Sequence, residues 1–254
     1  KNIAEMEETG IDRSTTDEIS LITQWIGDNH KDPFAFWYHW RFSHLPYDPP
    51  KDKRIFPPAN DLKGDPPERI KTLIQTEVLI PYTTDQGWTT EERKWIDALY
   101  DAQIKHFDDD FERIHNVLAQ YRILDNTIII ITADHGEELV DHGHVGHAST
   151  ALTSRHFDEH LHIPLAILAP KVIREGRVID TMVQQVDILP TVFDMMDWDI
   201  PETVQGRSLL PAIKGQSMDD IPVYAESVEG GYQSKPKQQS TFIRSVRTRN
   251  WKLI

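Results

Sequence analysis

An aspartate and a histidine stand directly after an apolar, β-branched segment of the chain. Residues 127–132 are only threonine and isoleucine, and Ala133, Asp134, His135 and Gly136 follow them. Open α/β sheets present metal and anion ligands at the carboxyl ends of buried strands. Glycine at position 136 permits a sharp exit from the strand, which lets two successive side chains face one centre. We therefore predict that Asp134 and His135 bind a metal ion.

Histidines are concentrated in the segment that follows. Seven of the 12 histidines lie between residues 135 and 162. A neutral imidazole binds metals, and a protonated one donates to oxyanions and can act as a general acid. A polar loop with satisfied histidines is the alternative, but the attachment of the cluster to a strand-end Asp134–His135 pair favours function. We expect Glu137 and Glu138 to cap the next turn or to face solvent.

His44 stands in a similar place. It follows the aromatic, apolar residues 34–40, which predict a second buried strand. Considered alone, His44 is equally compatible with a ligand and with a satisfied loop histidine.

The elements that must position these residues alternate between helix and strand. Apolar residues at helical spacing predict helices, and short β-branched or aromatic runs predict strands. A proline-rich stretch from Pro46 to Pro67 predicts a long ordered loop. The predicted elements are helices at 15–28, 89–122 and 186–196, and strands at 34–40, 127–132, 163–169, 221–226, 242–246 and 251–254.

This order predicts an α/β fold with a largely parallel sheet flanked by helices. The last three strands have no helix between them, which indicates the start of a small antiparallel subdomain. We place the catalytic α/β domain at 1–214 and the start of the subdomain at 215–254. Because the chain begins at Lys1 and stops at Ile254 inside a predicted strand, we expect it to be a fragment of a longer protein.

Composition excludes several classes of protein. The formal net charge of -14 argues against a nucleic-acid partner and requires that an anionic substrate be attracted by a local positive site. There is no cysteine, so disulfides, cysteine metal sites and a cysteine nucleophile are excluded within this stretch. No apolar run approaches the roughly 20 residues of a membrane span.

Several motifs occur in an order that resembles the sulfatase family of the alkaline-phosphatase-like superfamily. They cover almost the whole chain, and Ile131-Thr-Ala-Asp-His-Gly-Glu137 is similar to the family's segment at the metal strand. The remaining matches are Phe36 to Pro50 with its Ser-His-Leu-Pro-Tyr-Asp-Pro-Pro, Tyr100 to Ile104 with Asp108, Gly146-His147, Val186 to Thr191, Gln205 to Pro211, and Arg244 to Ile254.

The resemblance implies roles for particular residues. Asp134 and His135 form half of a site for one divalent metal ion, which is Ca²⁺ by family habit. The imidazole of His135 tilts the choice toward Mn²⁺ or Zn²⁺. His44 and His147 bind the sulfate or phosphate oxygens, and one of them protonates the leaving group. His142 and His144 are candidates to support these groups.

The implied activity is hydrolysis of a sulfuric ester, with a small molecule or a carbohydrate as substrate. The family's nucleophile, a formylglycine, lies upstream of every matched segment and is not present in this chain. Family habit favours a periplasmic or secreted protein, and the oligomeric state is not implied.

Other activities are compatible with the same residues. A phosphodiesterase or phosphonate monoester hydrolase of the superfamily shares the Asp-His pair, so sulfate and phosphate esters both remain open. A phosphoglycerol-type transferase is disfavoured because no membrane segment is seen. A different class of protein, an inactive remnant that binds metal or carbohydrate, predicts anion binding without turnover.

Overall fold

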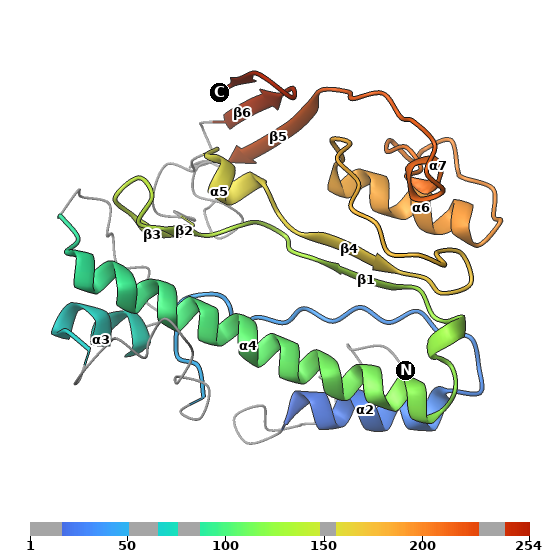
Figure 1. Ribbon diagram of the computed structural model, residues 1–254, viewed down its shortest axis with the longest axis horizontal. Helices are drawn as coiled ribbons and strands as arrows, with labels where there is room; N and C mark the ends of the chain where they lie inside the picture. Colours follow the sequence, from blue (N-terminus) through green and yellow to red (C-terminus); the bar gives the residue numbers. More distant parts are fainter. Residues whose placement is uncertain (1–16, 51–65, 76–86, 148–155, 229–241) are drawn as a thin grey trace. The chain divides into compact units, whose positions relative to one another are not determined.

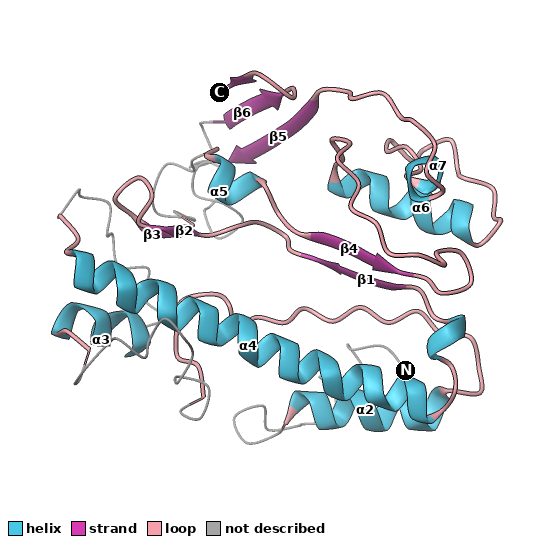
Figure 2. Ribbon diagram, in the orientation of Figure 1, coloured by secondary structure: helices cyan, strands magenta, loops and turns pink. Residues whose placement is uncertain are grey.

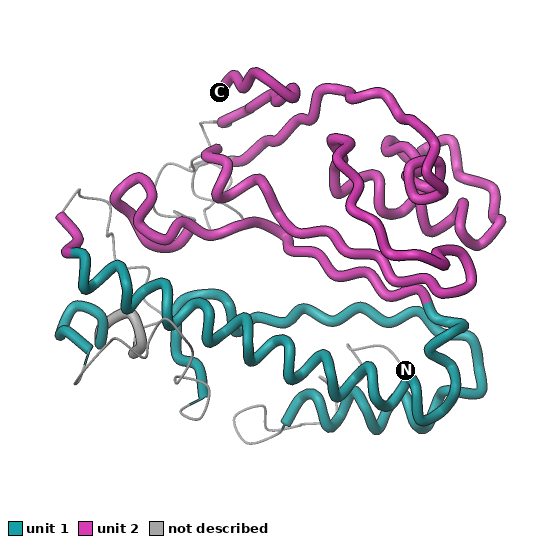
Figure 3. Tube along the Cα trace, in the orientation of Figure 1, with its two compact units in different colours: residues 1–76, 90–127 teal, residues 77–89, 128–254 magenta. Residues whose placement is uncertain are grey.

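The computed structural model describes residues 17–50, 66–75, 87–147, 156–228 and 242–254, with the helices and strands drawn in Figures 1 and 2. The chain divides into two compact units. Unit 1 consists of residues 1–76 and 90–127, and unit 2 consists of residues 77–89 and 128–254 (Figure 3). The domain boundary between residues 214 and 215 stays a prediction. Most of the predicted proline-rich loop lies outside the described residues.

Unit 1 is built on two helices, α2 (Glu18–Asn29) and α4 (Thr90–Gln120), which lie against each other. Both were predicted from the spacing of their apolar residues. The Asp17 carboxylate caps α2 by accepting hydrogen bonds from the backbone N–H groups of Ile19 and Ser20. Arg113 of α4 also binds this carboxylate, and its guanidinium lowers the pKa of Asp17 to about 2. Helix α3 (Glu68–Gln75) contacts α4. The 3₁₀ turn η2 (Leu124–Asn126) follows α4 in the chain.

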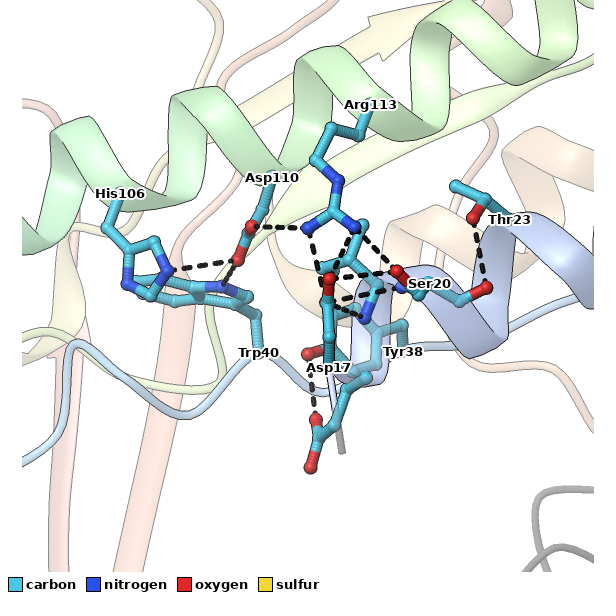
Figure 4. Close-up of polar contacts among 10 residues, drawn as sticks. Asp17, Ser20, Thr23, Tyr38, Trp40, His106, Asp110 and Arg113 are labelled. Carbon is cyan, nitrogen blue, oxygen red and sulfur yellow. Dashed lines mark hydrogen bonds and ion pairs between the residues drawn. The ribbon is translucent and has the colours of Figure 1, made fainter. Parts of the chain in front are cut away.

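The segment at 34–40 corrects one prediction, because it is extended but forms no strand within the part of the chain that is described. Its even-numbered side chains are half-buried and its odd-numbered ones are exposed. The rings of Phe34 and Phe36 lie 5.3 and 5.4 Å from the Trp25 ring of α2. Trp40 Nε1 donates to Asp110 of α4 at 3.0 Å (Figure 4). The aromatic alternation thus reflects packing against two helices. These helices cover the half-buried side chains of the segment, and no described strand pairs with it.

Unit 2 contains the strand pair β1 (Ile129–Thr132) and β4 (Leu165–Leu168). The helices α6 (Ile188–Met195) and α7 (Leu210–Ile213) follow, with the 3₁₀ turn η3 (Gln185–Asp187) before α6. One face of β4 packs on an apolar cluster centred on α7. The buried members of this cluster are Leu209, Leu210 and Ile213, and Leu165 and Ile167 of β4 pack against them.

The pairing of β1 with β4 differs from the largely parallel sheet that the sequence predicts. The two strands are antiparallel, with Ile129 opposite Leu168 and Thr132 opposite Leu165, and every other described strand pair is antiparallel as well. A parallel pair requires a crossover that returns the chain to the start of the first strand. Here the chain re-enters beside the end of β1, where Thr132 Oγ1 donates to the Pro164 carbonyl at 2.9 Å.

Two smaller strand groups complete unit 2. The hairpin β2 (Glu138–Leu139) and β3 (Val145–Gly146) and the short helix α5 (Asp158–Leu161) lie between β1 and β4 in the sequence (Figure 1). The strands β5 (Val223–Val228), β6 (Phe242–Arg247) and β7 (Lys252–Leu253) form an antiparallel sheet in that order. This sheet confirms the antiparallel arrangement predicted for the C-terminal strands.

Candidate functional site

The turn after β1 carries the two predicted metal ligands. Asp134 and His135 are exposed, with 62% and 42% of their side-chain surfaces accessible. The turn is held from behind, because Gly136 N donates to the His160 carbonyl of α5 at 2.8 Å. A Cβ at position 136 would stand 1.9 Å from the Glu159 carbonyl oxygen. Glycine is therefore required here by the close approach of α5.

One hydrogen bond determines which nitrogen of the His135 ring carries the proton. Its Nδ1 lies 2.9 Å from the Gly136 carbonyl, which can only accept, so Nδ1 carries the proton. In the neutral ring Nε2 then presents a lone pair, 3.7 Å from Asp134 Oδ2. Two electron-rich atoms in this position are stabilised by a cation between them or by a second proton on the ring. The donor set of one carboxylate oxygen and one imidazole nitrogen suits a divalent transition metal.

His147 lies beside this pair. Its ring centroid is 4.0 Å from that of His135, so the fold brings together three of the four predicted site residues. His147 Nδ1 donates to Glu137 Oε1 at 2.8 Å, and these side chains are only 13% and 6% exposed. A carboxylate behind an imidazole fixes the orientation of the ring. An imidazole that carries a proton on each nitrogen has a second donor on Nε2, which an anionic oxygen can accept.

Glu137 and Glu138 behave only partly as predicted. Glu138 does cap a turn, because its Oε1 accepts from the backbone N–H groups of His142 and His144 at 2.8 and 3.1 Å. Neither carboxylate faces solvent: Glu138 is fully buried and Glu137 nearly so. The sequence pattern missed the contact of Glu137 with His147. In the sequence Glu137 is only an acidic residue directly after Asp-His-Gly, and this position does not indicate a contact with His147 ten residues later.

His44 belongs to unit 1, whereas the other three residues belong to unit 2. It is exposed in the turn that follows the extended segment 34–40, and its Nδ1 donates to the Leu45 carbonyl. The segment before it is fixed to α4 by Asp110, which accepts from Trp40 and lies 3.5 Å from His106 Nε2 (Figure 4). That His44 acts in the same site as these three residues stays a prediction.

The other histidines of the cluster contact protein groups. His142 Nε2 lies 3.2 Å from Glu159 Oε2, and the ring stacks on Phe157. His156 is buried between two serine hydroxyls of β5 and β6, each 2.9 Å from one ring nitrogen. Burial, with Lys252 and His160 nearby, lowers the pKa of His156. These histidines support the fold around the exposed pair.

The described residues contain no group of three or more acidic, histidine or cysteine side chains placed to hold a metal ion. The assignment of Asp134 and His135 as half of a metal site stays a prediction. Within the same residues, no helix has both the length and the apolar character needed to cross a membrane.

Comparisons with known proteins identify the family of the chain. A family model described as Sulfatase matches residues 4–198, and one described as N-sulphoglucosamine sulphohydrolase, C-terminal, matches residues 154–254. Arylsulfatase K of Canis lupus familiaris is 34% identical over 124 residues, which are 49% of this chain and 22% of that protein. An N-acetylglucosamine-6-O-sulfatase of Bacteroides thetaiotaomicron is 29% identical over 156 residues, 61% of this chain and 27% of that protein.

The fold matches solved structures over most of its length. The phosphonate monoester hydrolase of Agrobacterium radiobacter superposes with a TM-score of 0.67 at 22% identity, over 92% of this chain and 50% of that one. This likeness confirms the predicted α/β, alkaline-phosphatase-like fold class. The chain spans about a quarter of the length of the two curated relatives it matches.

Proposed function

The chain belongs to the sulfatase family, and from this we propose that it forms part of the catalytic domain of a metal-dependent sulfuric ester hydrolase. The observation that carries the proposal is the juxtaposition of Asp134, His135 and His147. The ring centroids of His135, in the proposed metal half-site, and of His147, which the Glu137 carboxylate orients, lie 4.0 Å apart. Cleavage of a sulfate ester needs both: positive charge on the ester oxygens and a proton for the leaving alcohol.

We assign the metal to Asp134 Oδ2 and His135 Nε2, with its remaining ligands from outside the described residues. The orientation of His135 supports this assignment, because the hydrogen bond from Nδ1 leaves Nε2 with its lone pair. When bound, a divalent ion supplies Lewis-acid charge and orients the reacting group. An imidazole ligand favours Mn²⁺ or Zn²⁺ over Ca²⁺, which prefers oxygen.

His147 is assigned to the ester. Nδ1 is bound to Glu137, and the proposed role of a proton on Nε2 is to neutralise an anionic oxygen or to pass to the leaving oxygen. His44 is proposed as the second group on the substrate oxygens, on the basis of the family resemblance and its exposed position in the turn. The family's nucleophile, a formylglycine, is proposed to come from an upstream segment of the whole protein.

A sulfated carbohydrate is the proposed substrate class. The match of residues 154–254 to the C-terminal part of an N-sulphoglucosamine sulphohydrolase supports it, as does the similarity to an N-acetylglucosamine-6-O-sulfatase. We further propose that the protein is periplasmic or secreted, as family habit suggests. Fractionation of the source cells tests this location.

A phosphonate monoester or phosphodiester hydrolase is the second candidate. The Asp134–His135 pair favours it, since an imidazole ligand shifts the metal preference away from Ca²⁺. The superposition on a phosphonate monoester hydrolase shows only that the scaffold is shared.

The full-length protein should be assayed with 4-nitrophenyl sulfate, glucosamine 6-sulfate, a 4-nitrophenyl phosphonate monoester and bis(4-nitrophenyl) phosphate. We expect the highest kcat/KM with a sulfate ester. A phosphonate or diester preferred by more than about tenfold, equivalent to about 1.4 kcal/mol of transition-state stabilisation, would favour the second candidate. Binding of sulfate without turnover of any ester would indicate an inactive remnant.

Variants connect the activity to the assigned residues. We expect His147→Gln and Asp134→Asn each to lower kcat by about 100-fold or more. His162→Gln is the matched control, because His162 is an exposed histidine of the same cluster that lies just after α5. Equal losses in all three variants would contradict the assignment.

A further inference from the structure

One buried histidine touches both halves of the candidate site. His160 of α5 is 7% exposed. Its backbone carbonyl accepts from Gly136 N at 2.8 Å, directly after His135. Its ring Nε2 lies 3.3 Å from the carbonyl oxygen of Gly146, directly before His147. Because a carbonyl only accepts, Nε2 of His160 carries the proton and donates.

The two residues that His160 holds are both glycines, so no side chain of their own anchors them. Gly146 has a φ of +94°, in the left-handed region that glycine tolerates. A backbone segment of this kind depends on hydrogen bonds for its position. The ring of His160 supplies one from outside the hairpin, in addition to the ladder between Gly146 and Glu138.

Helix α5 is itself fixed to the C-terminal sheet. Asp158 accepts from Lys252 Nζ at 2.8 Å and from Arg247 Nη1 at 2.9 Å, and these cations lower the pKa of Asp158. His156 bridges Ser227 and Ser245 at 2.9 Å each. Helix α5 is therefore anchored to β6 and β7 by the two ion pairs of Asp158, whereas His156, which precedes the helix, makes its own contacts with β5 and β6.

We propose that His160 is a positioning residue that holds His147 beside the metal half-site by donating its Nε2 proton to the Gly146 carbonyl. The inference rests on the proposed function, since it concerns the anion-binding and proton-donating role of His147. His160 itself is buried, so it acts through Gly146 and does not touch the substrate. Loss of the ring donor frees the His147 end of the hairpin, while the backbone bond to Gly136 remains.

The test uses three variants of the full-length protein. His160→Leu removes the ring donor and fills the buried position with an apolar side chain. His160→Gln places an amide N–H near the position of Nε2. His156→Asn is the matched control. His156 is also buried in the same segment, but its two side-chain hydrogen bonds are with serines of the C-terminal sheet. Each variant is measured by thermal unfolding, by the Kd for inorganic sulfate and by steady-state kinetics.

We expect H160L to weaken sulfate binding and to lower kcat by about tenfold each, the size typical of losing a supporting hydrogen bond behind an active-site histidine. H160Q should recover both to within about threefold of wild type. H156N should lower Tm without changing either value. A purely structural role for His160 would make H160L and H156N alike.

The outcomes separate the two claims. If H160L binds sulfate and turns over ester as wild type does, or if H160Q is as impaired as H160L, the assignment to the Nε2 hydrogen bond is overturned. If the wild-type protein hydrolyses no ester, the proposed hydrolase function is overturned, and the sulfate Kd values still decide whether His160 positions the anion site.

Discussion

Replacing Gly136 by alanine is the sharpest test of how the site is held. The added Cβ would stand 1.9 Å from the Glu159 carbonyl oxygen, 3.0 Å from its carbon and 3.3 Å from the His160 Cα. These are backbone atoms and have no side-chain torsion with which to withdraw. Restoring an ordinary contact of 3.4 Å to the oxygen requires the turn and α5 to separate by about 1.5 Å, since 3.4 − 1.9 = 1.5.

The displacement has two measurable costs in the full-length protein. Overpacking of about 1–3 kcal/mol, plus about 1 kcal/mol for the stretched Gly136–His160 hydrogen bond, predicts a loss of about 2–4 kcal/mol of stability. This corresponds to a Tm lower by roughly 2–4 °C, because the unfolding entropy grows with chain length and the relatives are about four times as long as the segments matched here. A shift of more than 1 Å at the metal half-site predicts a kcat about 100-fold lower. Differential scanning fluorimetry and steady-state kinetics with the preferred ester measure both.

Gly176→Ala is the matched control, because a Cβ at this exposed glycine meets no atom within 4 Å. We expect its Tm to stay within about 1 °C of wild type and its kcat to be unchanged. If G136A also keeps the wild-type Tm and kcat, the turn is not held against α5 as described, and the reasoning fails.

Three further predictions concern single side chains. Burial lowers the pKa of His156 below its ordinary value of 6.5, so the unfolded chain binds the proton first as pH falls. Stability should therefore decline below pH 6.5 in wild type and decline less in His156→Asn, as denaturant titrations at about pH 7.5 and about pH 5.5 would show; parallel curves would contradict this. Glu137→Gln should lower kcat about tenfold with a nearly unchanged Tm, because a neutral amide orients the His147 ring less firmly than the carboxylate that contacts its Nδ1; an equal kcat would exclude that role. Asp110→Asn should cost about 1–3 kcal/mol in equilibrium unfolding, since this carboxylate is 7% exposed and accepts from Trp40; a wild-type midpoint would show that the contact contributes nothing.

Local patterns were enough to predict the long helix α4 and the strand β1, after which Asp134 and His135 stand. The helical spacing in 89–122 and the β-branched run at 127–132 correspond to α4 and β1. The antiparallel C-terminal strands were also predicted, because short apolar runs without intervening helices leave few other arrangements. The pattern failed at 34–40, where aromatic residues at every second position pack against helices. An alternation of period two reports one buried face and does not say what covers it.

The hairpin β2–β3 and helix α5 were not predicted, because they are only two and four residues long. Elements this short have no periodicity to detect and depend on contacts made elsewhere in the fold. They nevertheless decide which histidines remain exposed. His142 and His156 have the same residue type and neighbourhood in the sequence as His135, yet each is engaged by protein groups.

The sequence by itself determined the family, the fold class and the chemical identity of the candidate ligands, because residue types, their order and the end of a buried strand are local properties. Only the tertiary structure placed the ring of His147 against that of His135, put Glu137 behind it and set His160 beneath both. The two contacts of His160, with residues 14 and 24 positions away, are made through backbone carbonyls, which every residue possesses. A hydrogen bond to a backbone oxygen leaves no mark on the identity of its acceptor, so folding alone reveals it.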